Sequence, residues 1–170
     1  MTIPLTPGDY YAKSELEAMS PPPDTVSHVQ KLTVAGPWAP ARPLRFDGVI
    51  AMVERNGHLE YDMPKRLKGK GTYLFLNLTH QPNEAVFGQV VPGTTDADVS
   101  AYFAALRSGQ MPKPTFVSRV GGLMAMSPNH WAELTIDFPP GLYSVQSFYR
   151  NPDTGVGRVY EGFHRVVEFY

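Results

Sequence analysis

Short stretches in which apolar and polar residues alternate dominate the chain from residue 29 onward. Residues 131–138, for example, place alanine, leucine, isoleucine and phenylalanine at every second position. This spacing predicts a strand with one buried face, because successive side chains of a strand point to opposite sides. Alternation or short apolar runs predict strands at residues 29–34, 49–54, 59–63, 72–77, 85–91, 123–126, 131–138, 142–149 and 163–169. Glycine, proline, asparagine and aspartate separate these stretches, which is typical of an all-β sandwich or barrel.

One stretch has helical periodicity instead. Thr95 and Asp98 have the spacing of a capping box, in which each side chain bonds the backbone N–H of the other. Apolar residues then recur at i, i+3, i+4 and i+7, as Val99, Tyr102, Phe103 and Leu106. Gly109 follows as a stop signal. We predict an inserted helix near residues 95–108 whose apolar stripe faces the core.

Residues 1–28 form a distinct N-terminal arm in this interpretation, with the sandwich domain over residues 29–170. Ser14 and Glu17 form a second capping box, which predicts a short helix through Met19, and the prolines of residues 21–23 end it. The arm carries several apolar groups, at Tyr10, Tyr11, Leu16 and Met19. They either pack on the arm's own domain or join two subunits into a homo-oligomer.

Composition excludes several functions. The formal net charge is −1, so there is no strongly basic field for nucleic acid. The chain has no cysteine, which excludes thiolate metal sites, disulfides and thiol nucleophiles. No apolar run is long enough to span a membrane. The N-terminus lacks the basic and apolar regions of a signal peptide, so we expect a cytoplasmic protein.

Residues 70–170 contain three motifs that occur in this order in bacterial cupredoxin-like domains. The first is the strand 75–79, which contains an asparagine and is followed by Asn83 and Glu84. The second is Pro-Gly-Thr-Thr at 92–95 before the helix, with a Gly-Gly turn after it. The third is Phe-Pro-Pro-Gly-Leu-Tyr at 138–143. The chain therefore resembles the cupredoxin-like family, and this resemblance implies a Greek-key β-sandwich.

The resemblance also implies where copper ligands would stand. A blue-copper centre needs two histidines, a cysteine thiolate and a weak axial methionine. The matching positions hold Asn83, Ser147, Arg158 and Phe163. All four are replaced, and Arg158 puts a cation where a metal cation would bind. We therefore expect a copper-free protein with no cofactor.

The polar residues at this former metal end are the candidate site. Glu84, His80 and Arg158 are the candidate acid, base or charge-stabilising residues of an enzyme. The candidate ligand-binding residues are Asn83, Ser147, Tyr149, Tyr160, Phe163 and His164. Polar groups that converge among aromatic rings are typical of small-molecule pockets. The alternative is that side chains filled the former metal end when copper was lost, so that no pocket remains there. The five histidines form no local metal motif, although His80 and His164 could approach the same end of the sandwich.

Three functions stay open at this point. The first is a copper-free protein that binds a small organic molecule or a partner chain at the former metal end. The second is a cofactor-free, non-redox enzyme of a biosynthetic pathway, such as a cyclase, isomerase or lyase. The third is a structural protein that assembles through its N-terminal arm. We expect neither nucleic acid nor a membrane as a partner.

Overall fold

The computed structural model describes residues 5–12, 30–37 and 45–170, and it divides the chain into two compact units. The smaller unit contains an antiparallel pair, β1 (Gly8–Ala12) and β2 (Gln30–Val34). The strand predicted at 29–34 is thus present, but in the described residues it pairs with β1 and not with a sandwich strand. The helix predicted at 14–19 lies outside the described residues. Tyr11 is 65% exposed on this pair. Self-association through the arm stays a prediction, which sedimentation of the chain with and without residues 1–27 would check.

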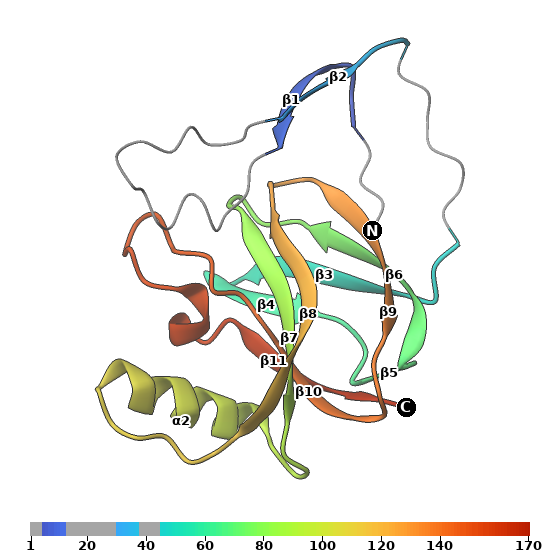
Figure 1. The fold of residues 1–170 in the computed structure, drawn as a ribbon. Helices are drawn as coiled ribbons and strands as arrows, with labels where there is room; N and C mark the ends of the chain where they lie inside the picture. Colours follow the sequence, from blue (N-terminus) through green and yellow to red (C-terminus); the bar gives the residue numbers. More distant parts are fainter. Residues whose placement is uncertain (1–4, 13–29, 38–44) are drawn as a thin grey trace. The chain divides into compact units, whose positions relative to one another are not determined.

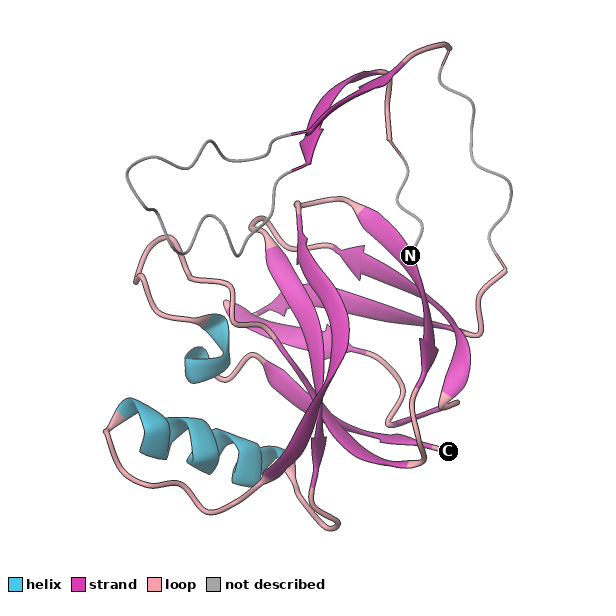
Figure 2. Ribbon diagram, in the orientation of Figure 1, coloured by secondary structure: helices cyan, strands magenta, loops and turns pink. Residues whose placement is uncertain are grey.

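The larger unit is a sandwich of two mixed sheets, so the predicted fold class is confirmed (Figures 1 and 2). One sheet has the order β4-β3-β6-β9 and the other has the order β5-β11-β10-β7-β8. The strand bounds are β3 Gly48–Arg55, β4 His58–Asp62, β5 Arg66–Leu67, β6 Lys70–Asn77, β7 Asn83–Val90, β8 Phe116–Met126, β9 Trp131–Asp137, β10 Gly141–Gln146 and β11 His164–Phe169. The β3–β6 and β11–β5 pairs are parallel and the other pairs are antiparallel.

The core lies between the sheets and is built from the faces that alternation predicts. In β6, Tyr73 and Phe75 are buried, and in β9, Ala132 and Ile136 are buried. The other sheet contributes Phe87, among others, which meets Phe75 edge to face. Burial of such aromatic and aliphatic surface is the main source of stability of a sandwich.

The predicted helix is α2 (Asp96–Arg107), and its capping box of Thr95 and Asp98 is present. Val99 and Phe103 of the predicted stripe are buried, whereas Leu106 at its end is exposed. Two polar contacts tie α2 to β11. The backbone N–H of Val166 donates to Asp96 Oδ1 at 2.6 Å, and Ser100 Oγ lies 3.0 Å from His164 Nε2. The short 3₁₀ helix η1 (Arg158–Glu161) lies beside α2 (Figure 1).

The Gly-Gly pair that we interpreted as a turn lies inside β8 instead. Gly122 has φ +152°, and a Cβ there would stand 2.1 Å from the carbonyl oxygen of Ala85. A side chain is therefore excluded by the close approach of β7, which explains why glycine occupies this strand position. No helix in the described part of the chain is long and apolar enough to cross a membrane.

Candidate functional site

The connection between β6 and β7 is organised by buried amides. The side chain of Asn77, at the end of β6, donates from Nδ2 to the carbonyls of Gln81 at 2.8 Å and Met126 at 2.7 Å. Its Oδ1 accepts from the backbone N–H of Thr79 at 3.1 Å. Asn83, at the first copper position, donates to Thr79 Oγ1 at 2.9 Å. Its amide therefore serves the fold of this connection, and within the described residues its buried Oδ1 has no partner.

Ser147 and Glu84 join β7 to the long segment between β10 and β11, residues 147–163. The backbone N–H of Glu84 donates to Ser147 Oγ at 3.2 Å. The carboxylate of Glu84 in turn accepts from the backbone N–H of Phe148 at 2.9 Å. Both side chains thus hold the start of this segment, which we call the 147–163 loop.

Arg158 is more than nine-tenths buried, with 9% exposure. Its Nη1 donates to Glu161 Oε2 at 3.0 Å, so its partner is Glu161 and not Glu84. Glu161 also accepts from Asn151 Nδ2 at 3.0 Å and from Thr154 Oγ1 at 2.6 Å. Burial would raise the pKa of Glu161, but these hydrogen bonds from Thr154, Asn151 and Arg158 hold it below its ordinary value. Glu161 is therefore ionised, and its carboxylate links Asn151, Thr154 and Arg158 within the loop.

Phe163, at the axial copper position, is part of the core. Its ring stacks on Tyr61 with 4.2 Å between ring centroids and 11° between the planes. Burial, together with the charge of Glu84, raises the pKa of Tyr61 well above its ordinary value, so its hydroxyl stays neutral and donates to the carbonyl of Glu84. Phe163 therefore contributes to the core through an aromatic stack.

The remaining candidates do not share a common centre. The exposed His80 pairs with Glu54, 2.6 Å from Nδ1 to Oε2. Tyr149 is half-buried, and its carbonyl accepts from the N–H of Arg158 at 2.9 Å. Tyr160 packs edge to face on Phe103. The acid–base candidates His80, Glu84 and Arg158 thus bond to three different partners.

His164 is buried against α2, and this makes a testable prediction about pH. Burial lowers the pKa of His164, and the carboxylate of Asp96 opposes the shift only in part. The unfolded chain, with an ordinary value near 6.5, binds this proton more readily. The stability that neutral His164 contributes is fully present above pH 6.5. It is lost as the pH falls from there through the lower pKa of the folded chain, by up to about 1.4 kcal/mol per pH unit. Urea unfolding between pH 8 and pH 5 should give a flatter profile for His164→Gln than for the native chain. Equal profiles would contradict the prediction.

A pocket of about 330 Å³ reaches Arg158. Its lining combines polar and apolar residues: Gly57, His58, Leu59, Asn151, Arg158, Glu161 and Phe163. Sequence reasoning missed His58, Asn151 and Glu161. The Asn-Gly turn at 56–57 indicates a hairpin between β3 and β4. It does not indicate that the tip of this hairpin lines the same pocket as the 147–163 loop.

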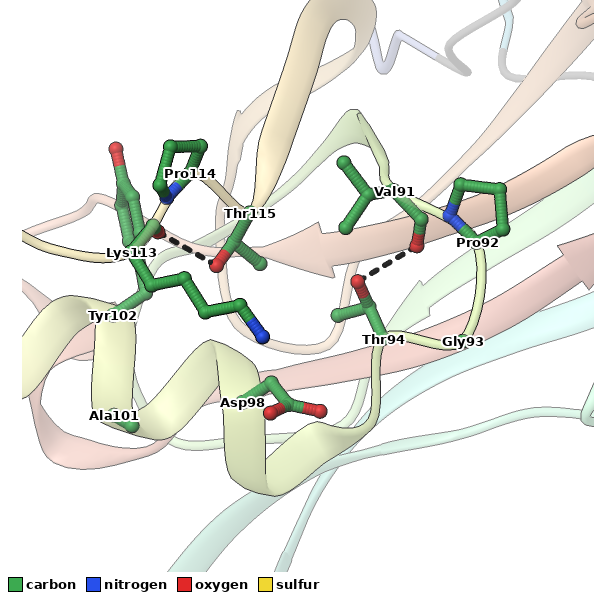
Figure 3. Close-up of a pocket in the computed structure, with 10 residues that line it drawn as sticks. All are labelled: Val91, Pro92, Gly93, Thr94, Asp98, Ala101, Tyr102, Lys113, Pro114 and Thr115. Carbon is green, nitrogen blue, oxygen red and sulfur yellow. Dashed lines mark hydrogen bonds between the residues drawn. The ribbon is translucent and has the colours of Figure 1, made fainter.

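A second pocket, of about 160 Å³, lies where the segments before α2 and before β8 meet (Figure 3). Two of its hydroxyl groups bond within the chain. Thr94 Oγ1 donates to the carbonyl of Val91 at 2.7 Å, and Thr115 Oγ1 donates to that of Lys113 at 3.0 Å. The carboxylate of Asp98 belongs to the capping box of α2. We assign this pocket no ligand.

The residues at the four positions that the resemblance matches to copper ligands do not fit a blue-copper centre. The chain has no thiolate to offer, Phe163 is stacked on Tyr61, and Arg158 brings a buried cation. Among the described residues there is no cluster of three or more histidine, aspartate or glutamate side chains that could hold a metal ion.

Comparison with known proteins finds a weak likeness among solved structures. No protein-family model and no curated protein matches the chain. Among solved structures, the chain is similar to the Na-dithionite reduced auracyanin of the photosynthetic bacterium Roseiflexus castenholzii. The identity is 21% and the TM-score is 0.40, over 72% of this chain and 94% of that one. A likeness of this size bears on neither ligand nor activity.

Proposed function

We propose that the protein binds a small organic molecule in the Arg158 pocket, without copper. The observation that carries this proposal is Arg158 itself. It lines a pocket of about 330 Å³, and its Nε is buried with no hydrogen-bond partner in the described part of the chain. A buried donor without a partner is costly, because desolvating it is not offset by a hydrogen bond. Because Nε itself is buried, a ligand acceptor atom would satisfy this donor once the Arg158 side chain turns it toward the pocket.

The charges of the pocket favour a neutral acceptor. Glu161 already balances Arg158 at 3.0 Å. A second anion beside this pair would leave an uncompensated negative charge in a partly buried site, which is unfavourable. Leu59 and Phe163 are apolar residues of the lining. The proposed ligand is therefore an amide or another carbonyl compound with a small apolar body.

Titration with N-methylacetamide, followed by amide chemical shifts, tests this proposal. We expect saturable shifts at Asn151 and Glu161 in the native protein and none in Arg158→Met. The variant should remain folded and lose about 1–2 kcal/mol of stability, because Glu161 keeps its bonds from Asn151 and Thr154. Arg66→Met, which breaks a surface ion pair with Glu168, is the matched control and should bind normally. A folded Arg158→Met that binds as well as the native chain would move the site elsewhere.

We expect the purified protein to be colourless and to contain no stoichiometric copper. Arg158 repels a metal cation, and neither Asn83 nor Phe163 offers a ligand of the kind that copper prefers. Metal analysis and a visible spectrum after expression with added copper would check this. One copper ion per chain with an intense visible band would refute the copper-free part of the proposal.

The enzyme alternative remains a prediction, and the separate partners of His80, Glu84 and Arg158 favour binding over catalysis. The cytoplasmic location also remains a prediction.

A further inference from the structure

The described part of the chain contains thirteen lysine and arginine residues. Six of them pair with a carboxylate within 4.0 Å: Lys31, Arg55, Arg66, Lys68, Lys70 and Arg158. Seven have no such partner in the part of the chain that the structure describes: Arg45, Lys65, Arg107, Lys113, Arg119, Arg150 and Arg165. Three of these seven, Arg107, Arg119 and Arg150, lie around Phe148. In a chain with net charge −1, this concentration of unbalanced positive charge needs an explanation.

An open groove of about 340 Å³ lies at this place, on different residues from those of the Arg158 pocket. It is lined by Arg107, Phe148, Arg150, Gly155, Val156, Gly157 and Tyr160. None of these described lining residues is acidic. The guanidinium of Arg119 lies over the Phe148 ring, 5.7 Å from its centroid. The groove thus combines two lining arginines, a third arginine nearby and two aromatic rings.

Local structure explains only part of this arrangement. Arg107 stands in the last turn of α2, where a cation interacts favourably with the helix dipole. Arg119 gains a cation–π contact with Phe148. Arg150 makes only a long hydrogen bond, 3.4 Å from Nη1 to the carbonyl of Gly155. A bound anion would give these exposed arginines a charged partner.

We infer that this groove binds a small organic anion with a planar ring. Arginine recognises carboxylates and phosphates through paired N–H donors, which are strong when the acceptor is charged. Arg107 and Arg150 supply this recognition, and the rings of Phe148 and Tyr160 supply an apolar wall against which a planar ring packs. The groove differs in charge from the Arg158 pocket, where Glu161 balances the arginine.

Titration with benzoate, phenyl phosphate and benzamide tests the inference by amide chemical shifts and calorimetry. We expect benzoate and phenyl phosphate to shift the amide signals of Gly155, Val156 and Gly157 saturably. The compound that binds more tightly shows whether the groove prefers a carboxylate or a phosphate. Benzamide, which has the same ring without the charge, should bind at least tenfold more weakly. A higher salt concentration should weaken the binding of the two anions and leave the binding of benzamide unchanged.

Variants locate the site. Arg107→Gln and Arg150→Gln should each lower the affinity for the tighter-binding anion roughly tenfold or more, as expected for the loss of a charge-assisted hydrogen bond. Arg45→Gln, which removes an exposed arginine that does not line the groove, is the matched control and should change binding less than twofold. Benzamide binding as tightly as benzoate, or equal losses in Arg45→Gln and Arg150→Gln, would overturn the inference. Because neither Arg107 nor Arg150 lines the Arg158 pocket, these results are independent of the N-methylacetamide titration.

Discussion

Replacing Phe163 with alanine is expected to lower the free energy of unfolding by about 3–5 kcal/mol. The side chain is only 1% exposed and stacks on Tyr61, so truncation removes apolar contacts and leaves a cavity in the core. The stack also positions the Tyr61 hydroxyl that donates to the carbonyl of Glu84. Urea unfolding of the native chain and the variant, followed by fluorescence, measures the difference.

The control is Phe46→Ala, since Phe46 is 42% exposed and should cost less than about 1 kcal/mol. Phe163→Met places a flexible side chain of similar size there, the type found at the axial copper position, and should cost less than about 1.5 kcal/mol. If Phe163→Ala were as mild as Phe46→Ala, the aromatic stack would not contribute to the core.

Replacing Asn77 with alanine is expected to cost about 3 kcal/mol or more. Asn77 is fully buried, and its amide joins the carbonyls of Gln81 and Met126 to the N–H of Thr79. Truncation leaves several buried backbone groups without this partner, and each unsatisfied group costs about 1–3 kcal/mol. Thermal and urea unfolding measure the loss.

Thr72→Ala provides the comparison for Asn77→Ala. The Thr72 hydroxyl bonds Thr135 on an exposed sheet face, 3.0 Å between Oγ1 atoms, so its loss should cost less than about 1 kcal/mol. Similar losses in the two variants would show that the Asn77 amide contributes no more than a surface hydrogen bond. The Asn77 contacts also set the path into β7, so we expect Asn77→Ala to shift the amides of Asn83 and Glu84 in folded protein.

The 147–163 loop is the element on which both proposals depend. One set of its residues, Asn151, Arg158 and Glu161, lines the Arg158 pocket. Another set, among them Arg150 and Tyr160, lines the arginine groove. Loops held on a rigid sandwich commonly carry binding residues, because the scaffold limits their movement. Glu84 and Ser147 hold the start of this loop through the backbone of β7 and Phe148.

The fold class, most strands and the helix α2 could be predicted from residue patterns alone. Alternation in β6 and β9 marks the buried side of each strand, because side-chain direction follows backbone period alone. The capping box of Thr95 and Asp98 marks the start of α2, because both bonds form within four residues. The resemblance to cupredoxin-like domains also predicts a copper-free protein, because residue types alone show that the matching positions hold no copper ligands. This stays a prediction.

Which of these residues contact each other could not be predicted from such patterns and was seen in the folded chain. Hydrophobic periodicity indicates which side of an element is buried, and a capping box indicates where a helix begins. Neither indicates which other element packs against it. Arg107, Arg119 and Arg150 come from α2, β8 and the 147–163 loop, and no local pattern joins them. The choice of Glu161 over Glu84 as the partner of Arg158 depends on the tight turn of η1, which brings residues three apart together. Contacts between distant segments are set by the packing of whole sheets, and for that reason the pockets appeared only in the folded chain.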